Sequence, residues 1–178
     1  MTKTSKKQLK NDEQRVIEIL KKNSNESIND ISKKCGFSRQ KVWRIIKQLE
    51  KSNTIWGYTA VIDDEKQGLK SYIVLIKRSN KPLTKELIDT ITSRQIDKTA
   101  KKMDVYIQSS IYLNGFYDWI ICINTDELKK AKSFVELLNN ILSGYLIDVK
   151  LIEKIFPAKL CGIENPEIEK LNDFFINL

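Results

Sequence analysis

The hydrophobic pattern of this chain changes its repeat near residue 60, and this change sets the number of folding units. Before that point, apolar residues recur at the three- and four-residue spacing of short amphipathic helices. Beyond it, runs with the alternation of strands are interrupted by two helical stretches. A chain of 178 residues is long enough for two small domains. We therefore expect an α+β protein with a helical head at 1–60, a linker at 61–69 and a mixed body at 70–162.

The first sixty residues predict three short helices. Asn11 and Ser27 are placed to cap the first and second helices, and Asp30 gives Ser27 the spacing of a capping box. Ser38 is placed to cap a third helix, and Gly36 precedes it where a tight turn requires a positive φ. Two helices joined by a glycine turn are typical of a helix-turn-helix. Their inward-facing residues are expected at Val16, Ile17, Leu20, Ile28, Ile31, Cys35, Val42, Ile45, Ile46 and Leu49.

The excess positive charge is confined to this head. Residues 1–60 contain 14 lysines and arginines against 6 acidic residues, whereas residues 61–178 contain 17 of each kind. A basic module joined to a neutral one favours a head that binds a polyanion, because clustered lysines neutralise phosphates. The alternative is a head that is rich in lysine only for solubility.

The outward face of the third helix carries side chains suited to the major groove of DNA. Arginine binds guanine through two hydrogen bonds and glutamine pairs with adenine, so Arg44 and Gln40 are the expected base readers. Phosphate contacts are expected along the same helix and at its N-terminus, from Ser38, Arg39, Lys41, Lys47 and Lys51. A basic helix face exposed only to water is the structural alternative.

Two further features of the head bear on DNA binding. Trp43 falls between the inward and outward faces of the third helix, and predicts either packing at the domain edge or contact with a sugar or a thymine methyl group. The N-terminal tail would add non-specific support through Lys3, Lys6, Lys7 and Lys10.

The rest of the chain predicts a ferredoxin-like unit. Strands are expected around 72–77, 105–113, 119–123 and 147–155, with helices opening at Pro82 and Thr125 and a hairpin turn at Asn114 and Gly115. The order strand, helix, strand, strand, helix, strand places both helices on one face of an antiparallel sheet. Because the other face needs cover, we expect a homodimer formed through the sheet.

Three segments lie outside that unit or interrupt it. Residues 55–62 are β-branched and aromatic and predict a linking strand. The helical signal fades after Arg94, and the second strand follows only after residue 104. An amphipathic C-terminal helix is expected within 163–178, as core cover or an interface element.

Composition excludes several kinds of function. The absence of histidine removes histidine-based acid–base catalysis and most transition-metal sites, so we expect no enzyme, no metal and no cofactor. Cys35, Cys122 and Cys161 never form a Cys-x-x-Cys pair and are expected as buried free thiols. No apolar run approaches the roughly 18 residues of a membrane helix, and the N-terminus lacks a secretory signal. A cytoplasmic protein that does not bind membranes is the expectation.

Three stretches of the head resemble the DNA-binding domain of the Lrp/AsnC family of prokaryotic transcriptional regulators: 30–38, 42–50 and 55–60. The most specific part is the tetrad Gly57-Tyr58-Thr59-Ala60, which in that family opens an extended linker. Asn53 stands where the family often has glycine, and asparagine tolerates the left-handed conformation. The resemblance implies a winged helix-turn-helix head followed by a ferredoxin-like effector and oligomerisation domain.

The resemblance also implies an effector site and closed oligomers. Residues 115–118 look like the family's Gly-x-x-Asp element, near which an amino acid or related small molecule binds between dimers, so Gly115 and Asp118 are candidate effector residues. Their structural alternative is a glycine with a special backbone angle and an aspartate that binds the N–H groups of its own turn. Dimers, tetramers or octamers are expected.

The implied function is sequence-specific DNA binding in transcription regulation. An architectural DNA-binding protein with little sequence preference is the alternative, because lysine excess alone serves non-specific binding. Sirohaem decarboxylases resemble the family in both domains, but their chemistry depends on histidine, which this chain lacks.

Overall fold

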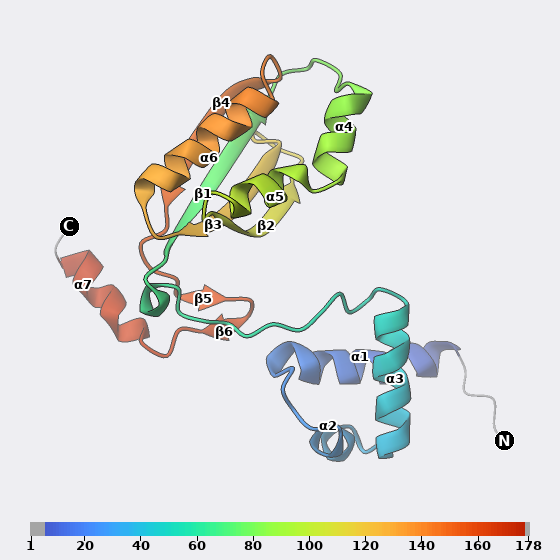
Figure 1. Cartoon of the computed structure of the whole chain (residues 1–178). Helices are drawn as coiled ribbons and strands as arrows, with labels where there is room; N and C mark the ends of the chain where they lie inside the picture. The colour runs from blue at the N-terminus through green and yellow to red at the C-terminus, as the bar shows by residue number, and fades with distance from the viewer. Residues whose placement is uncertain (1–5, 177–178) are drawn as a thin grey trace. The chain divides into compact units, whose positions relative to one another are not determined.

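The computed structural model describes residues 6–176, with side chains from residue 8 onward. The chain divides into two compact units, one of Met1–Val61 together with Ala158–Leu178 and one of Ile62–Pro157. Figure 1 shows the three helices of the head, α1 and α2 in blue and α3 in cyan, and the sheet of the body with its covering helices.

The head consists of α1 (Lys6–Lys22), α2 (Ile28–Cys35) and α3 (Arg39–Lys51). The predicted inward residues form its core, with Ile28 as the exception, because it is the first residue of α2 and stays exposed. The buried side chains of this core are Val16, Ile31, Cys35, Val42, Ile45 and Leu49.

The start of α1 differs from the prediction. Asn11 does not cap the helix, because α1 begins at Lys6 and Asn11 lies inside it. Lysine, glutamine and leucine before Asn11 are good helix formers, so the helix extends through them. The predicted basic tail is therefore partly helix: Lys6, Lys7 and Lys10 belong to α1, and Lys3 lies outside the described residues.

The predicted caps at both ends of α2 are confirmed, whereas the helix expected to open at Thr125 begins only at Leu128 and has no side-chain cap. Ser27 Oγ accepts a hydrogen bond from the backbone N of Asp30 at 3.1 Å and donates one to Asp30 Oδ2 at 2.6 Å. Gly36 ends α2 in the left-handed conformation with φ 63°. Asn53 has φ 56° just after α3, as expected of an asparagine in a glycine position.

The segment between α3 and the body is not a strand. No strand lies between Lys51 and Lys70 in the part of the chain that the structure describes, so the predicted linking strand at 55–62 is wrong. A strand requires hydrogen bonds from a neighbour, and β-branched residues alone do not supply them. A short 3-10 turn, η1 (Glu65–Gln67), precedes the body.

The body is an antiparallel sheet in the order β2-β3-β1-β4, covered on one face by helices (Figure 1). This confirms the ferredoxin-like unit. The strands are β1 (Lys70–Arg78), β2 (Tyr106–Tyr112), β3 (Trp119–Thr125) and β4 (Leu146–Glu153). The helices are α4 (Lys85–Thr92), α5 (Gln95–Lys101) and α6 (Leu128–Ile141).

Two details of the body differ from the prediction. Residues after Arg94 form α5, whose Ile96 and Ala100 are buried in the core. Arg94 has φ 58° and separates α4 from α5, so the spacing of buried residues in α4 does not continue into α5. In β2 the register shifts between Ile107 and Ser109. Strict alternation would place Ile107 and Ile111 on the same face, but because of this shift Ile111 lies opposite Ile120 on the helix-free face.

The C-terminal segment contains a hairpin that the sequence analysis did not predict. Strands β5 (Lys159–Leu160) and β6 (Ile163–Glu164) pair across a two-residue turn, followed by η2 (Ile168–Lys170) and the expected helix, α7 (Leu171–Ile176). Both turn residues have positive φ, 48° at Cys161 and 84° at Gly162, the geometry of a type I′ hairpin. Cys161 is exposed, so the expectation of three buried thiols is wrong at that position, while Cys35 is buried and Cys122 is half-buried.

Candidate nucleic-acid interface

The position of α3 is set by the turn that follows α2. Gly36 donates its N–H to Lys33 O at 3.2 Å, and Phe37 donates to Ser32 O at 2.9 Å, which satisfies carbonyls at the end of α2. The chain then enters α3 directly at Ser38. This is the helix-turn-helix arrangement predicted from the glycine position.

Ser38 organises the N-terminus of α3. Its side chain accepts a hydrogen bond from the backbone N of Lys41 at 3.2 Å. The first turn of α3 carries no acidic residue, so nothing on the helix opposes an anion approaching its free N–H groups.

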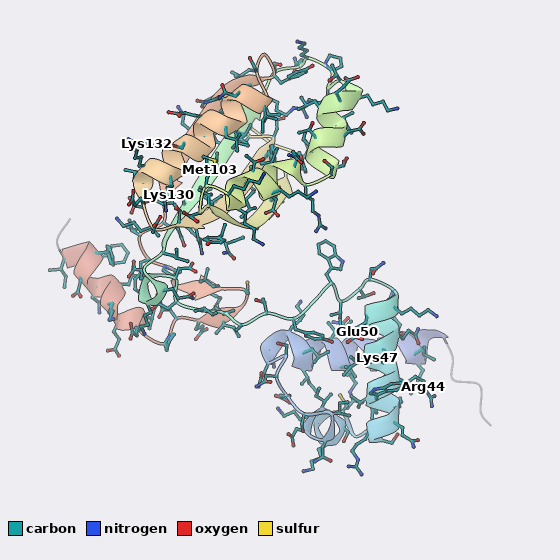
Figure 2. All side chains as sticks on the ribbon, viewed as in Figure 1. Arg44, Lys47, Glu50, Met103, Lys130 and Lys132 are labelled. Atoms are coloured by element: carbon teal, nitrogen blue, oxygen red, sulfur yellow. The ribbon has the colours of Figure 1, made fainter. Side chains whose placement is uncertain are left out.

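Most of the predicted DNA contacts share one accessible surface. Arg44, Lys47 and Glu50 follow one another along α3 in Figure 2. Trp43 is 54% exposed, so packing at the domain edge does not bury it within this chain. The exposed candidates on α3 are Arg39, Gln40, Trp43, Arg44, Lys47 and Lys51.

Lys41 has a different environment from the other candidates. Its Nζ lies 2.7 Å from Oδ2 of Asp12, whose side chain is only 9% exposed. The same ammonium lies 3.9 Å from the centre of the Phe37 ring, and Arg15 contacts that ring at 5.0 Å. The charge of Lys41 therefore compensates a nearly buried carboxylate inside the head, and the structure gives Lys41 a role in joining α1 to α3.

Lys47 is also paired, through a contact that the sequence analysis missed. Its Nζ donates to Glu50 Oε2 at 2.7 Å, and the hydroxyl of Tyr58 donates to Glu50 Oε1 at 3.2 Å. The hydrogen bond from Lys47 holds the pKa of Glu50 below its usual value, and Tyr58 adds to this effect. Partial burial, and next the carboxylate of Glu50, raise the pKa of Tyr58. The three-residue spacing of Lys47 and Glu50 signals their pairing, but nothing in the sequence signals the return of Tyr58.

The candidate effector residues serve the backbone of the body. Asp118 Oδ2 accepts a hydrogen bond from the backbone N of Arg78 at 2.8 Å and lies 3.4 Å from Nζ of Lys77. The Arg78 N–H is the main cause that lowers the pKa of Asp118. Asp118 thus ties the β2–β3 hairpin to the end of β1, rather than binding its own turn. Gly115 has no positive φ, so the special backbone angle considered for it is wrong.

Neither candidate lines the open pocket of the body. That pocket runs along α6 and β4 instead, and its lining residues include Leu128, Lys132, Glu136 and Leu151. Among residues 6–176, no group of three or more acidic or cysteine side chains lies close enough together to hold a metal ion. Within the same residues, no helix is both long and apolar enough to cross a membrane.

Comparison with known proteins places these features in a family context. A family model described as winged helix-turn-helix DNA-binding matches residues 13–55. The chain is 24% identical over 129 residues to the HTH-type transcriptional regulator FL11 of Pyrococcus abyssi, covering 72% of this chain and 79% of that protein.

Solved structures match both units in one alignment. The crystal structure of PH0061 aligns with a TM-score of 0.67 and 22% identity, covering 90% of this chain and 98% of that one. Bacillus subtilis LrpC aligns with a TM-score of 0.57 and 24% identity, covering 83% and 96%. This chain has the Lrp/AsnC fold.

Regulators of the Lrp/AsnC fold include one solved with an amino acid. The transcriptional regulator NMB0573 of Neisseria meningitidis, crystallised as a complex with L-Met, aligns with a TM-score of 0.61 and 17% identity, covering 84% of this chain and 92% of that one. The resemblance drawn from residues 30–60 is therefore confirmed at the level of the fold.

Proposed function

We propose that this protein is a sequence-specific DNA-binding transcriptional regulator. The observation that carries the proposal is the exposed face of α3, which presents Arg44 and Gln40 on a helix that the glycine turn and Ser38 hold in a helix-turn-helix. Such a face fits the major groove, where arginine and glutamine distinguish guanine and adenine. The winged helix-turn-helix match over residues 13–55 supports the same assignment.

The functional units follow from this assignment. Residues 1–60 would be the DNA-binding domain, 61–69 the linker, 70–162 the effector and oligomerisation domain and 163–178 a C-terminal helix. Arg39, Lys47 and Lys51 would contact phosphates, and Ser38 would bring the N-terminus of α3 to the backbone. Trp43 would contact a sugar or a thymine methyl, since it is exposed. Lys41 would stabilise the head instead of binding DNA, because Asp12 already holds its charge.

A homodimer through the sheet is part of the proposal. The helix-free face of the body carries Ile73 and Leu75 of β1 beside Ile120 and Cys122 of β3. Ile111 on the same face is 51% exposed, and this apolar surface fits a second copy of itself. Two heads related by a twofold axis would then bind paired half-sites.

The wider setting of the protein is proposed on the same grounds. An amino acid or related molecule is the effector class we propose, because the similar regulator NMB0573 was solved as a complex with L-Met. Gly115 and Asp118 are the candidate residues near such a site, from their resemblance to a Gly-x-x-Asp element. We place the protein in the cytoplasm, where DNA is accessible, and assign it no catalytic activity.

Selection of binding sites from a random DNA library tests the proposal without a known operator. We expect enrichment of a palindromic motif with half-sites about 10 base pairs apart or a multiple of that spacing. Uniform recovery of library sequences, with binding intact, would instead identify an architectural protein.

A further inference from the structure

Lys47 is not a free cation in this structure. Of the five basic residues of α3, two are paired with a carboxylate: Lys41 with Asp12, and Lys47 with Glu50. Within residues 6–176, Arg44 has no comparable partner. The two pairs differ in kind, because Asp12 is nearly buried whereas Lys47 and Glu50 both lie on the exposed side of the helix. Figure 2 shows Lys47 and Glu50 near each other on α3.

Glu50 is held from a second side by the tetrad 57–60. Tyr58, in the tetrad that follows α3, reaches back eight residues to donate to the oxygen that Lys47 leaves open. One oxygen of Glu50 therefore binds Lys47 on the helix and the other binds Tyr58 in the tetrad. Tyr58 thus positions the carboxylate toward Lys47, and this contact gives the tetrad a physical role.

The carboxylate of Glu50 stays ionised near neutral pH. Lys47 and Tyr58 both lower the pKa of Glu50 from its usual value of 4.5, so protonation does not release Lys47 near neutral pH. The side chains of Lys47 and Glu50 are 55% and 32% exposed, and such surface pairs are weak. A DNA phosphate can replace Glu50 as the partner of Lys47, but breaking the Lys47–Glu50 pair reduces the free energy gained from the phosphate contact. The negative charge of Glu50 also repels the phosphate.

We propose that Glu50, positioned by Tyr58, restrains Lys47 and thereby lowers the affinity of the head for DNA of any sequence. The inference rests on the proposed DNA-binding function. Because Lys47 would serve a phosphate and not a base, the restraint acts equally on operator and random DNA. Its effect is to limit the sequence-independent part of binding.

Fluorescence anisotropy of the full-length chain with random duplex DNA tests the restraint. Glu50→Gln is expected to tighten binding by about three- to tenfold near 0.1 M salt, and to steepen the salt dependence by about one counterion, because Lys47 then neutralises a phosphate. Glu18→Gln on α1 removes the same charge from an exposed glutamate and is the matched control. Equal gains from Glu50→Gln and Glu18→Gln would overturn the restraint in favour of a general charge effect.

Double variants separate restraint from structure. In a Lys47→Gln background, the gain of Glu50→Gln is expected to fall to the general charge effect that Glu18→Gln measures. Tyr58→Phe is expected to tighten binding by about twofold, a change no larger than one surface contact allows, and to have no effect once Glu50 is glutamine. An effect of Tyr58→Phe that persists in the Glu50→Gln background would show that Tyr58 does not act through Glu50.

A measurement without DNA distinguishes failure of the proposed restraint from failure of the proposed DNA-binding function. Acetylation of lysine amines, followed by mass spectrometry, is expected to modify Lys47 faster in Glu50→Gln than in the wild type, with Lys51 as the internal reference. Unchanged reactivity of Lys47 would overturn the restraint while leaving the proposed function intact. If neither the wild type nor Glu50→Gln binds DNA at low salt, the proposed function is wrong and the inference falls with it.

Discussion

At the scale of single residues, the head combines local helix caps with one ion pair that joins two helices. Ser27, Ser38 and Gly36 act locally, and their roles depend only on neighbours within three residues, so each was predictable. Lys41 was predicted to face DNA, but its partner Asp12 comes from another helix. Such a pairing depends on packing and leaves no signal in the local spacing.

Arg44 and Lys51 should differ in how their loss affects binding. Arg44→Ala is expected to cost about 1–3 kcal/mol on the selected operator and much less on random DNA, because it removes a base contact. Lys51→Ala is expected to weaken binding to both DNAs alike. Anisotropy titrations of both variants on both DNAs measure these losses. Equal loss on the two DNAs for Arg44→Ala would contradict its role as a base reader.

Asp118 should make the stability of the body depend on pH. Its folded pKa is lowered by the Arg78 N–H, so its contribution is present above the usual value of 3.8 and is lost as the pH falls through the folded pKa. Asp118→Asn is therefore expected to destabilise the body near neutral pH and to have progressively less effect as the pH falls below 3.8. Urea unfolding followed by the fluorescence of buried Trp119 measures the difference. A difference that stays constant over this range would contradict the assignment.

At the scale of elements, the order of helices and strands was predictable and some details were not. In the second helical stretch of the body, α6, the sequence predicted the buried residues only in part. The apolar spacing predicts an inward face made of Leu128, Ala131, Val135, Leu138 and Leu142. Phe134, outside that set, is fully buried in α6, while Leu128 is 43% exposed at the start of the helix. Phe134 lies three residues after Ala131 and four before Leu138, so its spacing did carry the signal.

Two other elements escaped prediction for physical reasons. α5 follows a left-handed Arg94, a conformation that arginine rarely adopts, and the sequence gives no cue for it. The β5–β6 hairpin has strands of only two residues, too short to show alternation. Its turn residue Gly162 was the only local signal.

The N-terminal cap of α3 should contribute to the stability of the head. Ser38→Ala is expected to destabilise the head by about 1 kcal/mol, because the backbone N–H of Lys41 loses its acceptor. Ser38→Asn retains an acceptor and is the matched control. Thermal unfolding followed by circular dichroism measures the change. Equal stability of the alanine and asparagine variants would contradict the capping role.

At the scale of the whole molecule, the ferredoxin-like sheet leaves one face without helices, and this face is where we propose that two chains meet. Leu75→Glu places a charge at its centre and is expected to yield a monomer, because a carboxylate is costly to bury in an apolar interface. Ile88→Glu on α4, at a residue 45% exposed, is the control and should leave assembly unchanged. Light scattering after size exclusion measures the mass. A wild-type monomer, or a Leu75→Glu variant with wild-type mass, would contradict the dimer.

The central claim is that this chain of the Lrp/AsnC fold reads DNA sequence through α3. The most direct measurement is fluorescence anisotropy with DNA from upstream of its own gene and a shuffled control, across about 50–200 mM salt. We expect a preference of about 1000-fold or more for the upstream fragment that persists at the higher salt. Equal and steeply salt-dependent binding to both fragments, or no binding to either, would contradict it.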